Sequence, residues 1–283
     1  MMADTLEAKL ARVRTALADY PRAIVAFSGG VDSTLLAALA RAVLGKDRVL
    51  AVTADSPSLA RTDLAEALRV AAELDLAHRV VATHEVEQPA YRVNDASRCF
   101  FCKHELFEIL DGVAGREAYS TVLYGAIGSD VASERPGQRA ALHHGVRAPL
   151  QDAGFDKFEV REAARRLGLS NWNRPQNACL SSRIPHGEPV TEEKLRRIES
   201  AEAALHAEGF RQVRVRHVGE RARIEVDPGE VHRFLDAALC ARLLEQFARI
   251  GFQSVAVTRA GYRAGGADRM DTDEVELSAI GRC

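Results

Sequence analysis

The sequence predicts an α/β fold, a doubly wound parallel sheet followed by a smaller α+β domain. In the first part of the chain, short and continuously apolar runs alternate with helical patterns. This is typical of strands buried on both faces of a parallel sheet. After about residue 187, apolar and polar residues alternate instead, as in half-exposed strands. We therefore expect one domain over residues 1–186 and a second over residues 187–283.

The first expected element is a helix over about residues 4–18, because apolar residues recur there three or four apart, and Pro21 ends it. The next elements alternate strand and helix. The expected strands are Ala23–Phe27, Val49–Thr53, His78–Ala82 and Thr121–Tyr124, and the expected helices are Thr34–Leu44, Leu59–Leu74 and Leu106–Ala114.

The second domain is expected to begin with a charged helix over Glu192–Glu208. Two strands follow, at Val213–His217 and Ala222–Val226, where every second residue is polar. A helix near Val231–Ile250 and a strand at Ser254–Thr258 complete this domain.

Composition excludes some classes of function. The chain has 283 residues, 47% of them hydrophobic, and a net charge of −2. Such a balance gives no overall basic field, so we expect no nucleic-acid partner. No stretch approaches the roughly 18 apolar residues of a membrane span, and the first residues lack the apolar core of a signal peptide. We expect a cytoplasmic protein without a membrane partner.

The strongest motif is a loop that follows the first expected strand and opens a helix. It reads Ser28-Gly29-Gly30-Val31-Asp32-Ser33. Glycines let the backbone approach a phosphate, and the amides of a helix N-terminus point at it. Ser28 and Ser33 add hydroxyl donors, and Asp32 is suited to hold Mg²⁺ against the phosphates. A serine-capped turn is the structural alternative, but the full string in this context favours phosphate binding.

Three cysteines form a second candidate site. Cys99 and Cys102 form a C-x-x-C pair, and Cys179 stands among polar residues with Arg183 close by. Thiolates of all three would hold a 4Fe–4S cluster and leave one iron open for a sulfur nucleophile. Zinc bound by the three cysteines and His104 is an alternative, and thiols without metal are another. Cys240 lies in an apolar helical pattern and is interpreted as a buried side chain.

At Ser28–Ser33 the chain resembles the PP-loop ATP pyrophosphatases, which adenylylate a substrate oxygen and release pyrophosphate. Over nearly its whole length it resembles the LarE family of ATP-dependent sulfur transferases within that superfamily. The matching segments are Ser28–Ser33, Glu134–Gly137, Gly145–Leu150, Ala178–Pro185 and Gly261–Arg263. One stretch departs from the family pattern, because Tyr124–Asp130 keeps Gly125 and Asp130 but lacks the family's Asn and two of its acidic residues.

The resemblance implies a function. The family converts the carboxylates of a pyridinium dicarboxylate mononucleotide to thiocarboxylates for the nickel-pincer cofactor of lactate racemase. Members with three cysteines use a cluster-bound sulfur, so Cys99, Cys102 and Cys179 point to that subtype. The resemblance also implies a homo-oligomer, with a hexamer as the expected form, and nucleotide contacts at Asp55 and Gly125.

The implied substrate carries phosphate and carboxylates, which guanidinium groups bind well. The candidate substrate-binding residues are Ser182, Arg183, Arg214, Arg216 and Arg263, and the candidate catalytic residues are Cys179, Arg183 and Asp32. An exposed strand face is the alternative interpretation of Arg214 and Arg216.

Three other functions combine similar motifs. A cluster-dependent tRNA thiolase also carries a PP-loop and three cysteines, but it should show a basic groove. A PP-loop synthetase that forms an amide with ammonia needs none of the three thiols. A nucleotide-binding module with a structural zinc would bind ATP without releasing pyrophosphate.

Overall fold

The computed structural model of the protein describes residues 5–128, 136–262 and 273–277. The chain forms two compact units. Unit 1 comprises Met1–Tyr91 with Ala96–Asn177, and unit 2 comprises Arg92–Asp95 with Ala178–Cys283. The division therefore falls after residue 177, whereas the sequence pattern placed it after residue 186.

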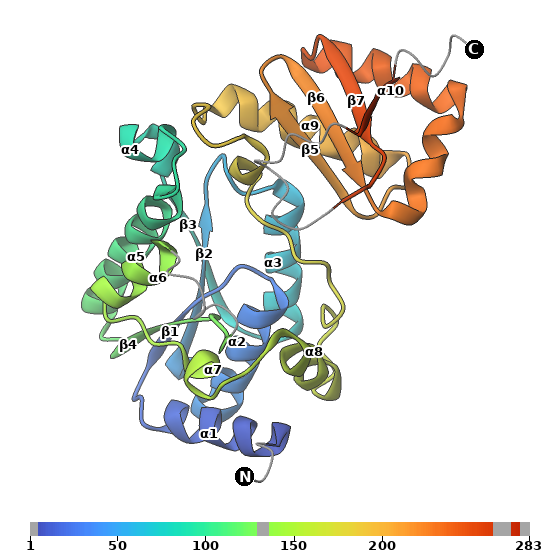
Figure 1. The fold of residues 1–283 in the computed structure, drawn as a ribbon. Helices are drawn as coiled ribbons and strands as arrows, with labels where there is room; N and C mark the ends of the chain where they lie inside the picture. Colours follow the sequence, from blue (N-terminus) through green and yellow to red (C-terminus); the bar gives the residue numbers. More distant parts are fainter. Residues whose placement is uncertain (1–4, 129–135, 263–272, 278–283) are drawn as a thin grey trace. The chain divides into compact units, whose positions relative to one another are not determined.

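Unit 1 alternates strands and helices, as Figure 1 shows. Its strands are β1 (Ala23–Ala26), β2 (Val49–Asp55), β3 (Ala77–Ala82) and β4 (Thr121–Tyr124). Its helices are α1 (Leu6–Ala18), α2 (Val31–Leu44), α3 (Arg61–Glu73), α4 (Pro89–Arg92, whose last residue is in unit 2), α5 (Arg98–Glu117), α6 (Pro136–His143), α7 (Pro149–Asp152) and α8 (Lys157–Arg166), with short 3-10 turns at Lys46–Arg48 and Glu85–Glu87. The predicted strands are confirmed, whereas α6, α7 and α8 were not predicted.

The sheet of unit 1 has the strand order β3-β2-β1-β4, and all its pairs are parallel. Successive side chains of β1 point to opposite faces, so Val25 belongs to one core and Ile24 to another. The first core takes side chains from α1, α2, α3 and α8, and the second takes them from α5 and α6. Helices thus cover both faces, which confirms the predicted doubly wound fold.

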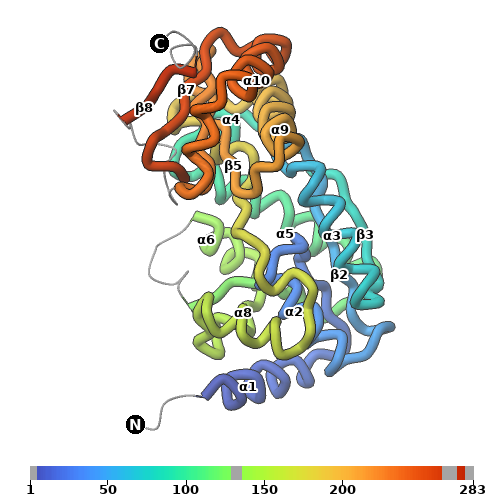
Figure 2. Tube along the Cα trace, turned by 90° about the vertical axis from the view of Figure 1, so that its right-hand side faces the viewer, coloured from blue at the N-terminus to red at the C-terminus, as the bar shows by residue number. Residues whose placement is uncertain are grey.

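Unit 2 contains a second sheet with the order β5-β6-β7-β8. Its strands are β5 (Val213–Val218), β6 (Arg221–Val226), β7 (Ser254–Thr258) and β8 (Glu274–Glu276), and its helical elements are η4 (Leu180–Arg183), α9 (Glu192–Ala207), η5 (Pro228–Leu235) and α10 (Ala237–Ile250). Helices α9 and α10 lie side by side (Figure 2) and pack on one face of the sheet around a single apolar core.

The prediction of half-exposed strands was wrong for β5 and β6. Every residue of the two strands is buried except Val218, the last of β5, and Arg221, the first of β6. The buried residues include the polar positions Arg214, Arg216, Arg223 and Glu225. The alternation of the sequence is real, but its polar face is covered and internally paired. The helix expected near 231–250 is also divided, because the Asp236 side chain accepts hydrogen bonds from the backbone of Ala238 and Leu239 and so caps a new helix there.

The position of the unit boundary has a local cause. The buried amide of Asn94 donates to the carbonyl oxygens of Pro185 (2.7 Å) and Glu188 (2.9 Å). Arg183 forms an ion pair with Glu202 of α9. Residues 178–188 are therefore held by unit 2. None of the described helices is long and apolar enough to span a membrane.

Candidate functional site: a phosphate loop and a buried arginine network

The phosphate loop joins β1 to α2, and α2 begins at Val31, so Asp32 and Ser33 lie in its first turn. The Ser33 hydroxyl donates to the Gly30 carbonyl (3.0 Å) and lies 3.1 Å from the Ser28 hydroxyl. The first amides of a helix have no partner within it and carry the positive end of its dipole. The loop therefore has a geometry that suits an anion.

Two glycines let neighbouring segments approach this loop closely. Gly29 has φ +70°, and a Cβ there would lie 2.7 Å from the Cα of Ala67 in α3. Gly125 follows β4, and a Cβ there would lie 2.8 Å from the backbone nitrogen of Ser33. Any side chain at position 125 would displace the amide that faces the predicted phosphate.

The strand order places the loop where nucleotides bind in open α/β sheets. Strands β2 and β3 follow β1 on one side, and β4 lies on its other side. The carboxyl ends of β1 and β4 therefore form the topological switch point, the usual position of a ligand crevice. Asp55 ends β2 at the same edge of the sheet and pairs with Arg61 at 2.6 Å.

Asp32 has a partner that the sequence did not reveal. The Lys157 ammonium, on the first turn of α8, donates to both carboxylate oxygens of Asp32 at 2.8 and 2.7 Å. Both side chains remain partly exposed, at 32% and 28%. A lysine beside a phosphate loop supplies a mobile positive charge for phosphate oxygens. The 125 residues between the partners explain why no local pattern could identify this pair.

A second contact that the sequence did not predict fixes the backbone of the loop at Gly29. The buried Asn171 amide donates to the Gly29 carbonyl and to the Thr34 hydroxyl, both at 2.9 Å. Arg174 binds Asp63 of α3 at 2.7 Å. These residues follow α8 and hold the glycine turn against α2 and α3.

Cys99 lies in the first turn of α5 and Cys102 about one turn later, so their side chains share a face of that helix. Cys99 is exposed and Cys102 is half-buried. Cys240 lies in the core of unit 2, where its thiol donates to the Phe234 carbonyl, and burial raises its pKa. It has the buried position that the sequence predicted.

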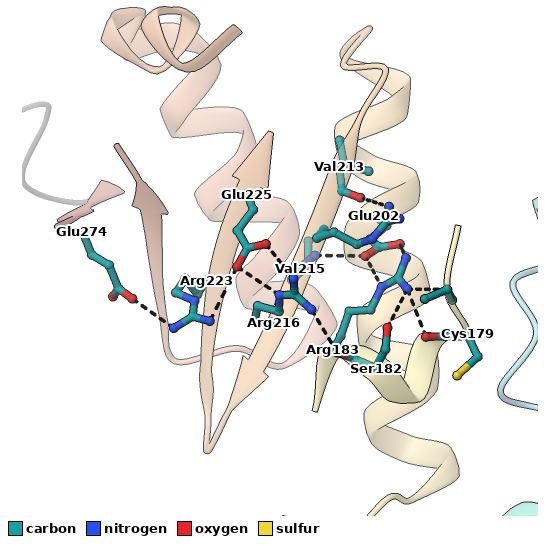
Figure 3. A network of polar contacts seen from close by, with 12 residues as sticks. Cys179, Ser182, Arg183, Glu202, Val213, Val215, Arg216, Arg223, Glu225 and Glu274 are labelled. Atoms are coloured by element: carbon teal, nitrogen blue, oxygen red, sulfur yellow. Dashed lines mark hydrogen bonds and ion pairs between the residues drawn. The ribbon is translucent and has the colours of Figure 1, made fainter. Parts of the chain in front are cut away.

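Cys179 caps η4 in unit 2, with its thiol half-exposed. Its carbonyl accepts from the Ser182 amide and from the Arg183 guanidinium, both at 3.0 Å. The Arg183 side chain is 0% exposed and binds Glu202 through two hydrogen bonds of 2.9 and 3.0 Å (Figure 3). Arg183 therefore acts on the Cys179 segment as a positioning residue that fixes its backbone.

Ser182 connects this segment to the sheet. Its carbonyl accepts from Arg216 at 2.9 Å, and Arg216 also pairs with Glu225 through two hydrogen bonds of 3.0 and 2.8 Å (Figure 3). Arg223 continues the chain of charges, since it lies 3.5 Å from both Glu225 and Glu274. We use the name arginine network for four arginines and three glutamates: Arg183, Arg214, Arg216, Arg223, Glu202, Glu225 and Glu274.

Arg214 differs from the other members. It donates to the Val213 carbonyl at 2.6 Å, and its guanidinium lies 5.1 Å from the centre of the Tyr262 ring. Burial lowers the pKa of Arg214, and the positive charge of Arg183 acts in the same direction. Among the described residues, the network combines four guanidinium groups with three carboxylates, and Glu274 also pairs with Arg221 at 2.7 Å. The fifth predicted arginine position, Arg263, lies outside the described residues.

Comparison with known proteins supplies the context for these two sites. The NAD synthase family model matches residues 5–98, which include the phosphate loop. An uncharacterized protein of Synechocystis sp. is 41% identical over 94% of this chain and 99% of its own length. The pyridinium-3,5-bisthiocarboxylic acid mononucleotide synthase of Lactiplantibacillus plantarum is 34% identical over 92% of this chain and 94% of its own length.

A more distant relative, named "Probable tRNA sulfurtransferase", comes from Moorella thermoacetica. It is 28% identical over 65% of this chain and 49% of its own length. The family model and the two relatives with a named activity support a PP-loop fold and an ATP-using enzyme for this chain.

Proposed function

Because the chain belongs to the family of the pyridinium-3,5-bisthiocarboxylic acid mononucleotide synthase, we propose that it is an ATP-dependent sulfur insertase. Its substrate would be a pyridinium dicarboxylate mononucleotide, whose carboxylates become thiocarboxylates for the nickel-pincer cofactor of lactate racemase. The observation that carries this proposal is the phosphate loop at the topological switch point, with Gly125 against the Ser33 amide.

The first step is activation. A substrate carboxylate oxygen attacks the α-phosphorus of ATP, a C–O–P linkage forms, and the bond to the β-phosphate breaks so that pyrophosphate leaves. The amides at the start of α2 would stabilise the charge that develops on pyrophosphate. Asp32 would hold Mg²⁺ there, and Lys157, released from Asp32, would move to a phosphate oxygen.

The second step is displacement of AMP by sulfur. A sulfur nucleophile attacks the acyl carbon, and the C–O bond to AMP breaks. Cys179 is the proposed sulfur-handling residue, since its thiol is half-exposed while Arg183 and Ser182 fix its backbone. The arginine network would bind the phosphate and carboxylates of the substrate, with Arg214 as the main contact and Ser182, Arg216 and Arg263 beside it.

We propose that Cys99, Cys102 and Cys179 together ligate a 4Fe–4S cluster. Two observations support this proposal: Cys99 and Cys102 share one face of α5, and thiolates are the ligands of such clusters. When bound, the cluster would supply an exchangeable sulfur. Zinc on the same thiols with His104, or no metal, is the alternative. We also propose a homo-oligomer, with a hexamer as the expected form.

Two findings keep a second function open to test. The tRNA sulfurtransferase relative favours a thiolated nucleic acid as product, and the NAD synthase match favours an amide formed with ammonia. Both products arise from an adenylylated intermediate, so pyrophosphate release alone does not separate them from the proposed function.

The test follows both steps in the full chain under anaerobic conditions, with ATP, Mg²⁺, sulfide and the pyridinium dicarboxylate mononucleotide. Pyrophosphate release reports activation, and mass spectrometry reports thiocarboxylate. Asp32→Ala should abolish both signals, and Cys179→Ala should abolish thiocarboxylate while pyrophosphate release continues. Asp47→Ala and Cys240→Ala serve as matched controls with both signals retained. Thiocarboxylate formed by Cys179→Ala would overturn the cysteine assignment.

The same preparation tests which metal is bound and which substrate and nucleophile are used. An iron content above roughly three per chain, together with acid-labile sulfide, supports the cluster. A content of one zinc and no iron contradicts it. Replacement of the mononucleotide by bulk tRNA, or of sulfide by ammonia, should give no product. Product formation with tRNA and a steep loss of binding with salt would favour the thiolase instead.

A further inference from the structure

Three histidines gather on unit 1, and only His104 was considered above, as a ligand of the alternative zinc site. His104 lies on α5, His143 ends α6, and His144 follows it directly. One nitrogen of each ring lies within 4.8 Å of the others. His143 is exposed, and the other two rings are half-buried, so the group is accessible to ions from solvent.

The hydrogen bonds of His144 organise this group. Its Nε2 lies 2.8 Å from Nδ1 of His104, and its Nδ1 lies 2.6 Å from a carboxylate oxygen of Asp111. A carboxylate on one imidazole nitrogen holds the proton there and leaves the other nitrogen as a lone-pair donor. Metal-binding histidines carry this kind of outer partner as a rule.

Aromatic packing also fixes the orientation of the His104 ring. Phe100 stacks on it, with ring centres 5.6 Å apart and planes inclined by 8°. Ring packing alone would account for a cluster of aromatic side chains. It does not account for two imidazole nitrogens that face each other at 2.8 Å while a carboxylate holds the far side of one ring.

We propose that His104, His143 and His144 form a binding site for a divalent transition-metal ion of the Zn²⁺ class, with Asp111 as its outer-shell partner. Imidazole nitrogens suit Zn²⁺, Ni²⁺ and Cu²⁺, whereas Mg²⁺ and Ca²⁺ require oxygen donors. Metal–nitrogen bonds of about 2.0–2.1 Å need only a small separation of the His104 and His144 rings. Three protein ligands leave a fourth position for water.

This site goes beyond the proposed function and uses none of its thiols. A bound ion would join α5 to the end of α6, two helices that pack on the same face of the sheet. The inference therefore stands or falls independently of the iron–sulfur cluster, and the test must remove the thiols from the measurement.

The test uses the full, tag-free chain with Cys99→Ser, Cys102→Ser and Cys179→Ser. Zn²⁺ affinity is measured by competition with a chromophoric chelator, and Co²⁺ serves as the spectroscopic probe. We expect one ion per chain and cobalt d–d absorption without a thiolate charge-transfer band.

Two variants in this background isolate the site. His143→Ala, at an exposed position, should weaken Zn²⁺ binding at least about tenfold, and Asp111→Asn should weaken it about 10–100-fold through the outer shell. The control His84→Ala, at an exposed histidine of the same unit, should leave affinity unchanged. Each variant should keep the urea transition of the metal-free chain.

Saturable binding that depends on His143 and Asp111 supports the site. No saturable Zn²⁺ binding in the triple-serine chain would overturn it, as would affinity that is the same in both variants as in the control. Loss of sulfur insertion does not enter either outcome, since the triple-serine chain lacks the cysteines of the proposed sulfur chemistry.

Discussion

The phosphate loop of unit 1 and the arginine network of unit 2 are both suited to anions, but they are built in opposite ways. The loop uses backbone amides of contiguous residues, and its geometry depends on two glycines. The network uses side-chain charges from η4, α9, β5, β6 and β8, which come together at a covered sheet face. The first site is therefore sensitive to added volume, and the second to a lost charge.

Loss of one charge in the network should have the largest effect on stability. Arg183→Ala leaves the Glu202 carboxylate buried without its main partner, and we expect a loss of about 3–5 kcal/mol. Urea denaturation monitored in unit 2 measures it. Replacement of both partners by apolar residues, in Arg183→Met with Glu202→Leu, should cost much less. Equal losses in the single and double variants would mean that volume rather than charge decides stability here.

Added volume at the loop should have the next largest effect. Gly125→Ala places a Cβ against the Ser33 nitrogen, and overpacking of this kind costs about 1–3 kcal/mol. We also expect pyrophosphate release to fall steeply. Gly115→Ala is the matched control, because a Cβ there meets nothing within 4 Å in the last turn of α5, and stability should rise by at most about 0.5–1 kcal/mol. Full turnover in Gly125→Ala would contradict the proposed phosphate position.

Lys157 separates function from stability at the loop. Its ion pair with Asp32 is partly exposed, so Lys157→Ala should change the unfolding free energy by less than about 1 kcal/mol. Loss of a phosphate contact should nevertheless raise the KM for ATP about tenfold, or 1.4 kcal/mol. Lys46→Ala, an exposed lysine on the same unit, should leave both quantities unchanged. Steady-state pyrophosphate release measures the KM.

A buried histidine should make the free energy of unfolding of unit 2 depend on pH, and this effect is smaller than the others. Burial of the His217 ring lowers its pKa, the Lys194 charge acts in the same direction, and neither ring nitrogen has a hydrogen-bond partner among the described residues. Below about pH 6.5 the unfolded ring binds a proton that the folded ring resists, so the unfolding free energy falls as pH falls.

His217→Leu should remove this contribution to the pH dependence of the unfolding free energy, which amounts to at most about 1.4 kcal/mol per pH unit. Urea denaturation at neutral pH and at about pH 5.5 measures the difference, and the exposed His232→Leu is the control. Some dependence should remain in the variant, because burial also lowers the pKa of His78. An unchanged pH dependence in His217→Leu would contradict the assignment.

Much of the fold could be predicted because it depends on local pattern. The strands of unit 1 are continuous apolar runs, and the phosphate loop occupies six consecutive residues. Helix α8 was not predicted, because its burial rests on small side chains such as Ala163 and Ala164 within a charged segment. Strand β8 pairs with β7 only through residues distant in sequence.

The sequence by itself determined the sheet, the glycine-rich turn after β1 and the presence of thiols and arginines, since spacing and residue type are enough for each. Only the tertiary structure decided which charges meet. Lys157 pairs with Asp32, which is 125 positions away in the sequence, and Arg183 is buried in an ion pair with Glu202. Pairing of this kind depends on chain crossings and burial, because a charge is costly inside a protein unless another segment neutralises it.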